Sequence, residues 1–191
     1  MAWNDAFAEL NTSVVDYFGE TISYLSLDGL TAVVGFSATL NRGGEDGSAT
    51  FNMPKTAVET PAFGDKVTDS DGVEWRIAEV LQPFSDRTPC NLKRSDFWET
   101  LDLQYMTDDG EVWENHTTGI TGLLMVSSSS EVVAAGDGHS VTVYEVKTTH
   151  LITPDHDMRF KWGSKYLYIT GIKDDDTHEL TTTFDCVEME A

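Results

Sequence analysis

Turn-forming dipeptides recur at short intervals along this chain, and each separates two stretches rich in strand-forming residues. The four clearest are Asp28-Gly29, Asp71-Gly72, Asp109-Gly110 and Gly163-Ser164. Asp-Gly between such stretches is a strong hairpin signal, because glycine accepts the backbone angles that a tight turn demands. A chain interrupted this often has little room for long helices. The sequence therefore predicts a mainly β protein.

The expected strands are short. In the first half they cover residues 21–27, 30–40, 50–53, 64–67, 73–80 and 89–93, and in the second half residues 101–106, 111–113, 119–126, 140–151, 157–162, 165–172 and 179–189. The start of the chain differs, because Trp3, Phe7, Leu10, Val14 and Phe18 recur at steps of three and four residues. This spacing predicts a short N-terminal helix.

The length of 191 residues allows one large domain or two small ones. A change of pattern near Asp96 divides the chain, and each half ends in a strand that contains a cysteine, Cys90 or Cys186. A faint similarity between residues 67–80 and 158–172 leaves open whether the halves arose by duplication. We predict two small β-barrel or sandwich modules in tandem, residues 1–95 and 96–191.

The chain is strongly acidic, with 12 Lys and Arg residues against 33 Asp and Glu residues and a formal net charge of -21. Both halves share this excess. A groove that grips nucleic acid by neutralising phosphates is therefore excluded. Two interpretations remain: the charge serves only solubility, or it forms a surface that lies beside DNA without adhering to it.

Composition and termini exclude further classes. No window approaches the ~18 consecutive apolar residues of a spanning helix, and 10% aromatic residues argue against disorder. Cys90 and Cys186 show neither metal-ligand spacing nor a disulfide framework, and the first residues lack a secretory signal. We expect a cytoplasmic product with reduced thiols.

Reactive constellations are missing from the sequence. Its histidines are scattered; the best metal candidates, His150 and His156 beside Asp155 and Asp157, lie in a turn that favours solvated loop residues. The acidic runs at 69–71 and 174–176 lack the closing glutamate of a calcium loop, so turn formation explains them. No nucleophile elbow, phosphate loop or dinucleotide fingerprint occurs. We therefore predict no catalytic residues, no cofactor and no metal.

Two polar segments of small residues are the candidate sites for contact with neighbouring subunits or partners. The first lies in residues 41–48 and the second in residues 127–138, where we expect a long loop. Their candidate residues are Arg42, Gly43, Gly44, Glu45, Asp46 and Gly47, and Ser127, Ser128, Ser129, Ser130, Gly136, Asp137 and Gly138. Such segments carry little apolar surface while unpaired, so we expect a neighbour to order them.

Several aromatic residues have the chemistry to stack nucleic-acid bases. They are Trp75, Trp98, Trp113, Trp162, Tyr166 and Tyr168. Base stacking also needs a cationic path for the backbone, which this acidic chain does not offer. We interpret these residues as core and hairpin anchors.

The end of the chain resembles the head-tail adaptor, or head-closure, family of tailed phages. In that family an arginine-containing strand, a glycine turn, a Tyr-x-Ile strand, an acidic turn and a last strand with Cys and Glu follow in order. The matching segments here are 152–163, 165–174 and 180–188 with Cys186, and 101–106 with Gly110 and Trp113 also fits.

The first half resembles the head-tail joining protein of lambda-like phages. The matching parts are the N-terminal helix, Phe51, the Gly64-Asp65-Lys66-Val67 run, Gly72, Trp75-x-Ile77-x-x-Val80, Pro83 and Cys90-x-Leu92. Proteins of these families usually carry one such domain, whereas this chain has two in tandem. Which tier of the connector it occupies is therefore open.

The resemblances imply a structural virion protein, without catalysis, that forms a ring of six or twelve copies at the head-tail junction. The ring would close the DNA-filled head and offer a surface to the tail after assembly in the host cytoplasm. Its implied partners are the portal or adaptor protein above, the tail terminator or tail tube below, and double-stranded DNA that passes without specific binding, with no membrane. The alternatives are a tail-side ring component, such as a tail terminator or tube-like protein, and an acidic-site hydrolase.

Overall fold

The computed structural model describes residues 19–43, 47–84, 86–107, 110, 112–134, 137–149, 157–175 and 181–189. Side chains are described over the same ranges except at 128–134, 137–141, 174, 175 and 189. The chain divides into two compact units, Met1–Ser95 and Asp96–Ala191. Both are built from antiparallel strands, which confirms the prediction of a mainly β protein. The predicted N-terminal helix lies outside the described residues.

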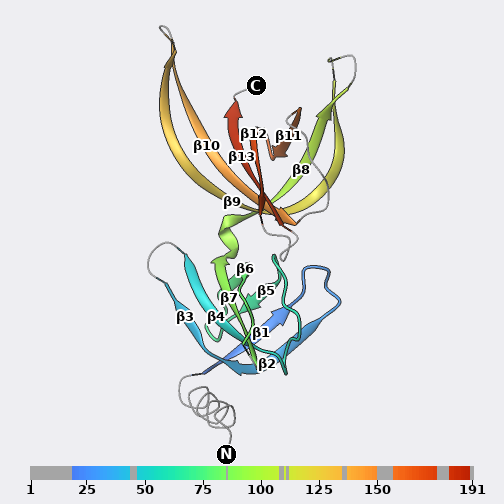
Figure 1. Ribbon diagram of the computed structural model, residues 1–191, viewed down its shortest axis with the longest axis vertical. Coiled ribbons are helices and arrows are strands. Elements are labelled where there is room, and N and C mark those ends of the chain that lie inside the picture. Colours follow the sequence, from blue (N-terminus) through green and yellow to red (C-terminus); the bar gives the residue numbers. More distant parts are fainter. Residues whose placement is uncertain are drawn as a thin grey trace, which may run out of the picture. The chain divides into compact units, whose positions relative to one another are not determined.

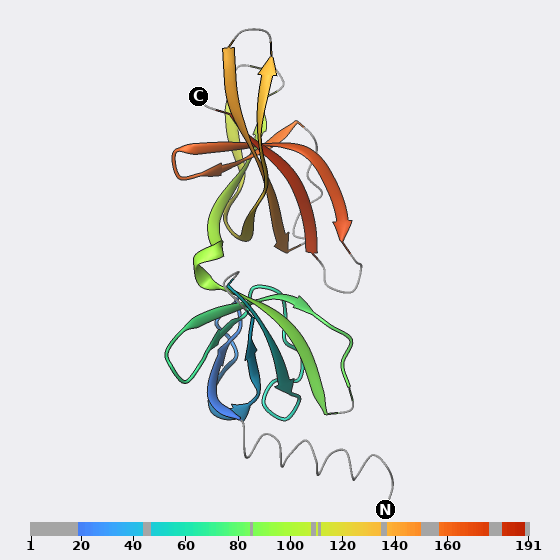
Figure 2. The same cartoon turned by 90° about the vertical axis from the view of Figure 1, so that its left-hand side faces the viewer.

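The first unit is one curled sheet of seven strands in the order β2-β1-β5-β6-β7-β4-β3. The strands are β1 (Glu20–Leu25), β2 (Ala32–Ala38), β3 (Leu40–Arg42), β4 (Ser48–Pro54), β5 (Lys66–Thr68), β6 (Glu74–Val80) and β7 (Arg87–Arg94). Thr39 alone separates β2 from β3, although these strands form opposite edges of the sheet. The sheet must therefore curl until its edges meet at that residue, as Figures 1 and 2 show.

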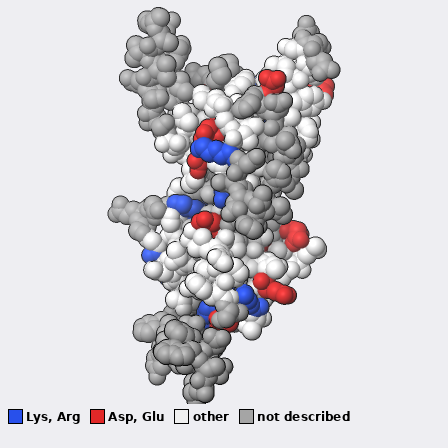
Figure 3. All heavy atoms as spheres, in the orientation of Figure 1, with Lys and Arg blue, Asp and Glu red and all other residues white. Residues whose placement is uncertain are grey.

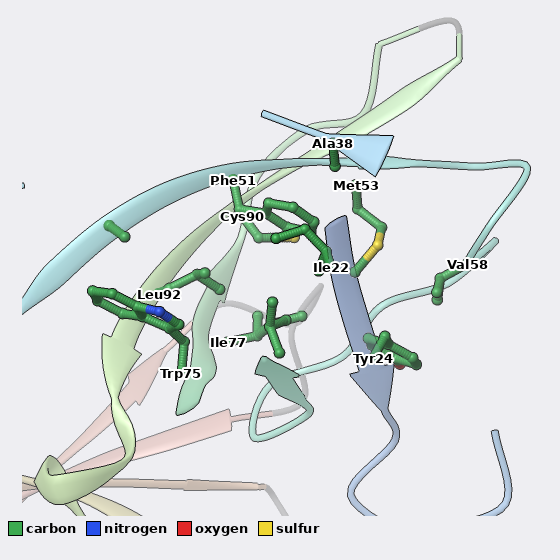
Figure 4. Close-up of a cluster of buried hydrophobic side chains, with 12 residues drawn as sticks. Ile22, Tyr24, Ala38, Phe51, Met53, Val58, Trp75, Ile77, Cys90 and Leu92 are labelled. Carbon is green, nitrogen blue, oxygen red and sulfur yellow. The ribbon is translucent and has the colours of Figure 1, made fainter. Parts of the chain in front are cut away.

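The core of the first unit follows the alternation of its strands. In β4, Ala49, Phe51 and Met53 are buried, while Thr50 and Asn52 are exposed. Side chains from every described strand of the sheet meet in one cluster, of which Figure 4 shows Ile22, Tyr24, Ala38, Phe51, Met53, Val58, Trp75, Ile77, Cys90 and Leu92. Removing each large apolar side chain from water stabilises the fold by roughly 1.5–3 kcal/mol.

The edge strands of this sheet are irregular or short. Register between β1 and β2 skips Gly35, which has a φ of 74°, so β2 contains a β-bulge. Left-handed backbone of this kind favours glycine because other residues clash there. The opposite edge strand, β3, has only three residues.

Asp65 anchors the β1–β2 turn to the loop before β5. Its Oδ1 accepts a hydrogen bond from the Leu27 amide (2.7 Å), and its Oδ2 accepts bonds from the Ala62 amide (2.7 Å) and the Tyr24 hydroxyl. Asp65 is buried, and neutral donors alone satisfy its carboxylate among the described residues. The Asp28-Gly29 turn is also wider than expected, because β1 already ends at Leu25.

The second unit is a closed six-stranded barrel in the order β10-β13-β12-β11-β8-β9, with β9 also paired to β10. The strands are β8 (Trp98–Met106), β9 (Trp113–Ala134), β10 (Asp137–Thr149), β11 (Met158–Trp162), β12 (Lys165–Asp175) and β13 (Thr181–Met189). The single turn η1 (Ser95–Phe97) precedes β8. Trp113 and residues 119–126, expected in two separate strands, both lie in the continuous β9, while residue 111 lies outside the described residues. The register shifts of β9 against β8 absorb the irregular polar stretch between them.

The barrel encloses its own apolar core. Phe160 of β11 and Phe184 of β13 contact edge to face, with ring centroids 5.3 Å apart, and Cys186 lies beside them in the same cluster. The faint internal similarity has a structural counterpart. β6 and β12 each show a register shift just after Ile77 and Ile169, where they pair with the last strand of their unit. Within the described residues, no helix is long and apolar enough to cross a membrane.

Tyr24→Phe should destabilise the first unit by about 1–2 kcal/mol, because the buried Asp65 carboxylate loses a donor. Native-state hydrogen exchange of β1 and β6 amides measures the loss in the first unit, and exchange of β8 and β12 amides measures the loss that the control causes in the second unit. Tyr105→Phe is the matched control, since that hydroxyl donates to Glu114 at an exposed site (2.8 Å). An equal loss in both variants would contradict the anchoring role of Asp65.

Cys186 should not react with thiol reagents in the native protein. Burial, followed by the nearby charge of Asp185, raises the pKa of Cys186 to about 12. At pH 8 roughly one molecule in ten thousand then carries the reactive thiolate. Disulfide-exchange titration should detect no fast thiol in the native state and both Cys90 and Cys186 in denaturant. A fast-reacting equivalent without denaturant would contradict this burial.

Candidate partner-contact surfaces

The first predicted contact segment, residues 41–48, includes the end of β3 and the first residue of β4. Gly43 is exposed and its amide donates to the Ser48 carbonyl (2.7 Å), whereas Gly47 is buried and its carbonyl accepts from the Arg94 amide (3.0 Å). Gly44, Glu45 and Asp46 lie outside the described residues. The two flanking glycines thus close a hairpin whose ends are fixed by backbone bonds.

Arg42, predicted as a contact residue of that segment, binds within its own unit. Its Nη2 lies 2.8 Å from Glu20 Oε2 and 2.9 Å from Asp69 Oδ2, and 3.5 Å from Asp71 Oδ2. These carboxylates belong to β1 and to the β5–β6 turn, so Arg42 ties the edge strand β3 to the far side of the curled sheet. Its ion pairs leave it less available to a partner.

Asp69 is the buried member of this network. Its Oδ1 accepts bonds from the amides of Asp71 (3.0 Å) and Val73 (2.8 Å), and its Oδ2 accepts from Trp75 Nε1 (3.0 Å). Burial would raise the pKa of Asp69. The bonds from Trp75, Arg42 and Val73 outweigh burial and lower this pKa below its ordinary value. Both oxygens are therefore used in holding the turn, as the interpretation of 69–71 as turn residues requires.

The prediction of a long loop at residues 127–138 is wrong, because the described residues of this segment form a β-hairpin. Ser127, Ser128, Ser129 and Ser130 lie in β9, and Asp137 and Gly138 lie in β10. Gly136 lies outside the described residues. The backbone ladder continues through Ser128, Ser129 and Ser130, which pair with residues 141–143 of β10. Their β-branched partners and the ladder itself override the weak strand preference of serine.

This hairpin continues beyond the barrel. β10 pairs with β13 only over Val143–Thr149, and β9 pairs with β8 only over Trp113–Leu123. Residues 129–134 and 137–142 therefore pair with each other alone among the described strands. We call this two-stranded segment the β9–β10 arm; Figures 1 and 2 show it running past the other strands of its unit. Ser127 is the bulged residue at its base.

A polar network lies near the base of the arm. Tyr144 donates to Glu188 Oε2 (2.8 Å), and Lys165 Nζ lies 2.8 Å from Glu188 Oε1. Burial, and then the bond to Glu188, raises the pKa of Tyr144, while the bond from Lys165 lowers the pKa of Glu188. Trp162 packs edge to face on Tyr144, with centroids 5.9 Å apart. These contacts fix β10, β12 and β13 where the arm leaves the barrel.

A second cluster of the barrel surrounds Arg159, a residue that the candidate contact residues did not include. The Arg159 guanidinium carbon lies 4.1 Å from the Trp113 ring centroid and 3.8 Å from that of Tyr166. Its Nε donates to Gln104 Oε1 (2.9 Å), and its Nη1 donates to the Tyr168 hydroxyl (2.9 Å). The prediction that these aromatic residues anchor hairpins fits this packing, but no sequence signal indicated what they hold.

The described residues bring no metal-binding chemistry together. Within the described ranges, no group of three or more His, Cys, Asp or Glu side chains is placed to hold a metal ion. His116 is exposed, and its Nδ1 lies 3.0 Å from Thr117 Oγ1. The metal candidates His150 and His156 lie outside the described residues. Comparison of the chain with protein-family models, curated proteins and solved structures finds no match.

Acidification should weaken the first unit through Asp69. Because its pKa in the folded protein lies below the ordinary 3.8, its stabilising contribution is complete above that pH and is lost as pH falls through the lower folded value. Asp69→Asn should therefore be less stable than the native protein at pH 7, and the difference should shrink toward pH 3.

Urea unfolding of both proteins at a series of pH values measures this difference. Asp71→Asn is the control, because the Asp71 side chain is 74% exposed and lies at the edge of the network. Its stability should follow that of the native protein at every pH. A difference for Asp69→Asn that stays constant with pH would contradict the assignment.

Proposed function

We propose that this protein is a structural component of the head-tail connector of a tailed phage. In this role copies of the chain assemble in the host cytoplasm and form a ring at the head-tail junction of the virion. The ring lies between the portal or adaptor protein and the tail, closes the DNA-filled head and provides the tail attachment surface. Two tandem β units and the resemblances in the sequence support this function.

The β9–β10 arm is the observation that carries the proposal. A two-stranded ribbon is marginally stable in water on its own. Among the described strands, both outer edges of the arm lack a partner. A neighbouring subunit that adds a strand or covers an edge would stabilise it, and a closed ring supplies each arm with such a neighbour.

Charge supports the same role. The net charge of -21 keeps a passing duplex from adhering to a ring. On the face that Figure 3 shows, Lys and Arg atoms lie beside Asp and Glu atoms in both units. Ion pairs with Asp or Glu of the same unit involve Arg42, Lys66, Arg87, Lys165 and Lys173.

A catalytic alternative is less well supported. An acidic-site hydrolase needs a carboxyl group whose pKa is raised so that it donates a proton. Among the described carboxylates, hydrogen bonds instead lower the pKa of Asp28, Asp69 and Glu188. A tail-side ring component, the other alternative, would share the arm and the charge. The proteins that co-purify with the chain would distinguish a tail-side component from a connector.

Shortening the arm tests the proposal. Replacing residues 129–142 with an Asn-Gly turn joins β9 to β10 at the barrel and leaves the core cluster of the second unit intact. The variant should fold. Particles made with it should resemble particles made without the chain, which we expect to be heads that leak DNA beside separate tails. Negative-stain images of the variant with portal should show no ring.

The control keeps the arm at full length with Ser129→Thr and Ser130→Thr, which preserves the backbone ladder. It should give normal particles and rings. Normal virions from the shortened variant, or virions that lack the chain, would overturn the proposal.

A further inference from the structure

The outer face of β11 carries two cations that form no ion pair with a carboxylate of the described residues. Arg159 and Lys161 alternate with Phe160, which lies in the barrel core, so both point away from it. Neither forms an ion pair with any described residue. The carboxylate nearest in register to Lys161 is that of Asp102, and its Oδ1 accepts a bond from the Gly119 amide (3.0 Å).

Other lysines of the same barrel are paired. Lys165 binds Glu188 at 2.8 Å, and Lys173 lies 2.8 Å from Asp185 Oδ1 and 3.5 Å from Glu145 Oε2. A chain with 33 acidic residues has many ways to place a carboxylate beside a cation. The two cations of β11 therefore stand out by their lack of an acidic partner among the described residues.

Arg159 is held in a fixed orientation with one nitrogen free. The residue is 8% exposed, and the rings of Trp113 and Tyr166 confine its guanidinium. With Nε and Nη1 bound to Gln104 and Tyr168, Nη2 donates to no described residue. A confined guanidinium loses little entropy when it binds a planar anion.

We propose that the outer face of β11 binds an acidic segment of a protein partner. A carboxylate of that segment accepts bonds from Arg159 Nη2 and Lys161 Nζ, and the rings of Trp113 and Tyr166 flank it. The surface is separate from the β9–β10 arm and does not depend on the proposed ring. A DNA duplex is the poorer occupant, because phosphate binding requires many cations and the chain repels a polyanion as long as DNA.

Two-dimensional NMR of the arginine Nε and tryptophan indole signals tests this site in the full chain. The probe is N-acetylated tetraglutamate amide at about physiological ionic strength, where screening over ~8 Å limits repulsion by the net charge. Saturable shifts of the Arg159 and Trp113 signals, with a roughly millimolar dissociation constant, are expected. Tetraglutamine amide should cause none.

Substitutions identify the groups responsible. Lys161→Met should weaken binding by about 2–5-fold, and Arg159→Met should abolish it. Arg159→Met also removes packing, so the indole spectrum of this variant is used to check that it folds. If Arg159→Met unfolds, Lys161→Met still tests the site. Lys173→Met is the control: it removes the same charge from a lysine with its own acidic partners and should leave binding unchanged.

Each outcome decides the proposal. Self-association of the native chain in sedimentation experiments, if Lys161→Met weakens it, would support the proposal and identify a second copy of the chain as the partner. Absence of saturable shifts, equal shifts with tetraglutamine, or binding of a short DNA duplex in place of the peptide would overturn it. Ring assembly, tested by shortening the arm, can fail or succeed independently of these results.

Discussion

The pairing of β10 with both β9 and β13 closes the second unit, and the other features of that unit depend on this closure. Backbone groups inside the barrel are satisfied by neighbouring strands, so the inward side chains need only be apolar and fit together. Phe160, Phe184 and Cys186 meet that requirement. Closure also fixes β9 and β10 at the barrel, and their further pairing forms the arm without help from an apolar core.

The first unit solves the same problem differently. Its sheet stops short of closure, and polar contacts replace the missing strand pairing. Arg42 connects the edge strand β3 to carboxylates of β1 and of the β5–β6 turn, while Asp65 holds the β1–β2 turn. A buried carboxylate with several donors is costly to disturb, so these contacts specify one curvature of the sheet.

Local sequence signals predicted the strands and failed where side chains carry little information. Turn dipeptides and alternation in 73–80 and 165–172 indicated hairpins that the structure contains. The serines at 127–130 gave no such signal. They are held in the strand by backbone hydrogen bonds, which do not depend on the small polar side chain. The surroundings of Arg159 were also beyond reach, since they depend on register between β8, β11 and β12.

The bulge at Gly35 and the brevity of β3 have a consequence for crowded copies of the chain. Edge strands with regular, unpaired backbone groups template the growth of shared sheets between molecules. In the first unit one edge is bent by its bulge, and the other offers three residues. Copies concentrated in one place are thus protected from merging into an amyloid-like stack, and contact between them is left to surfaces that recognise a particular neighbour.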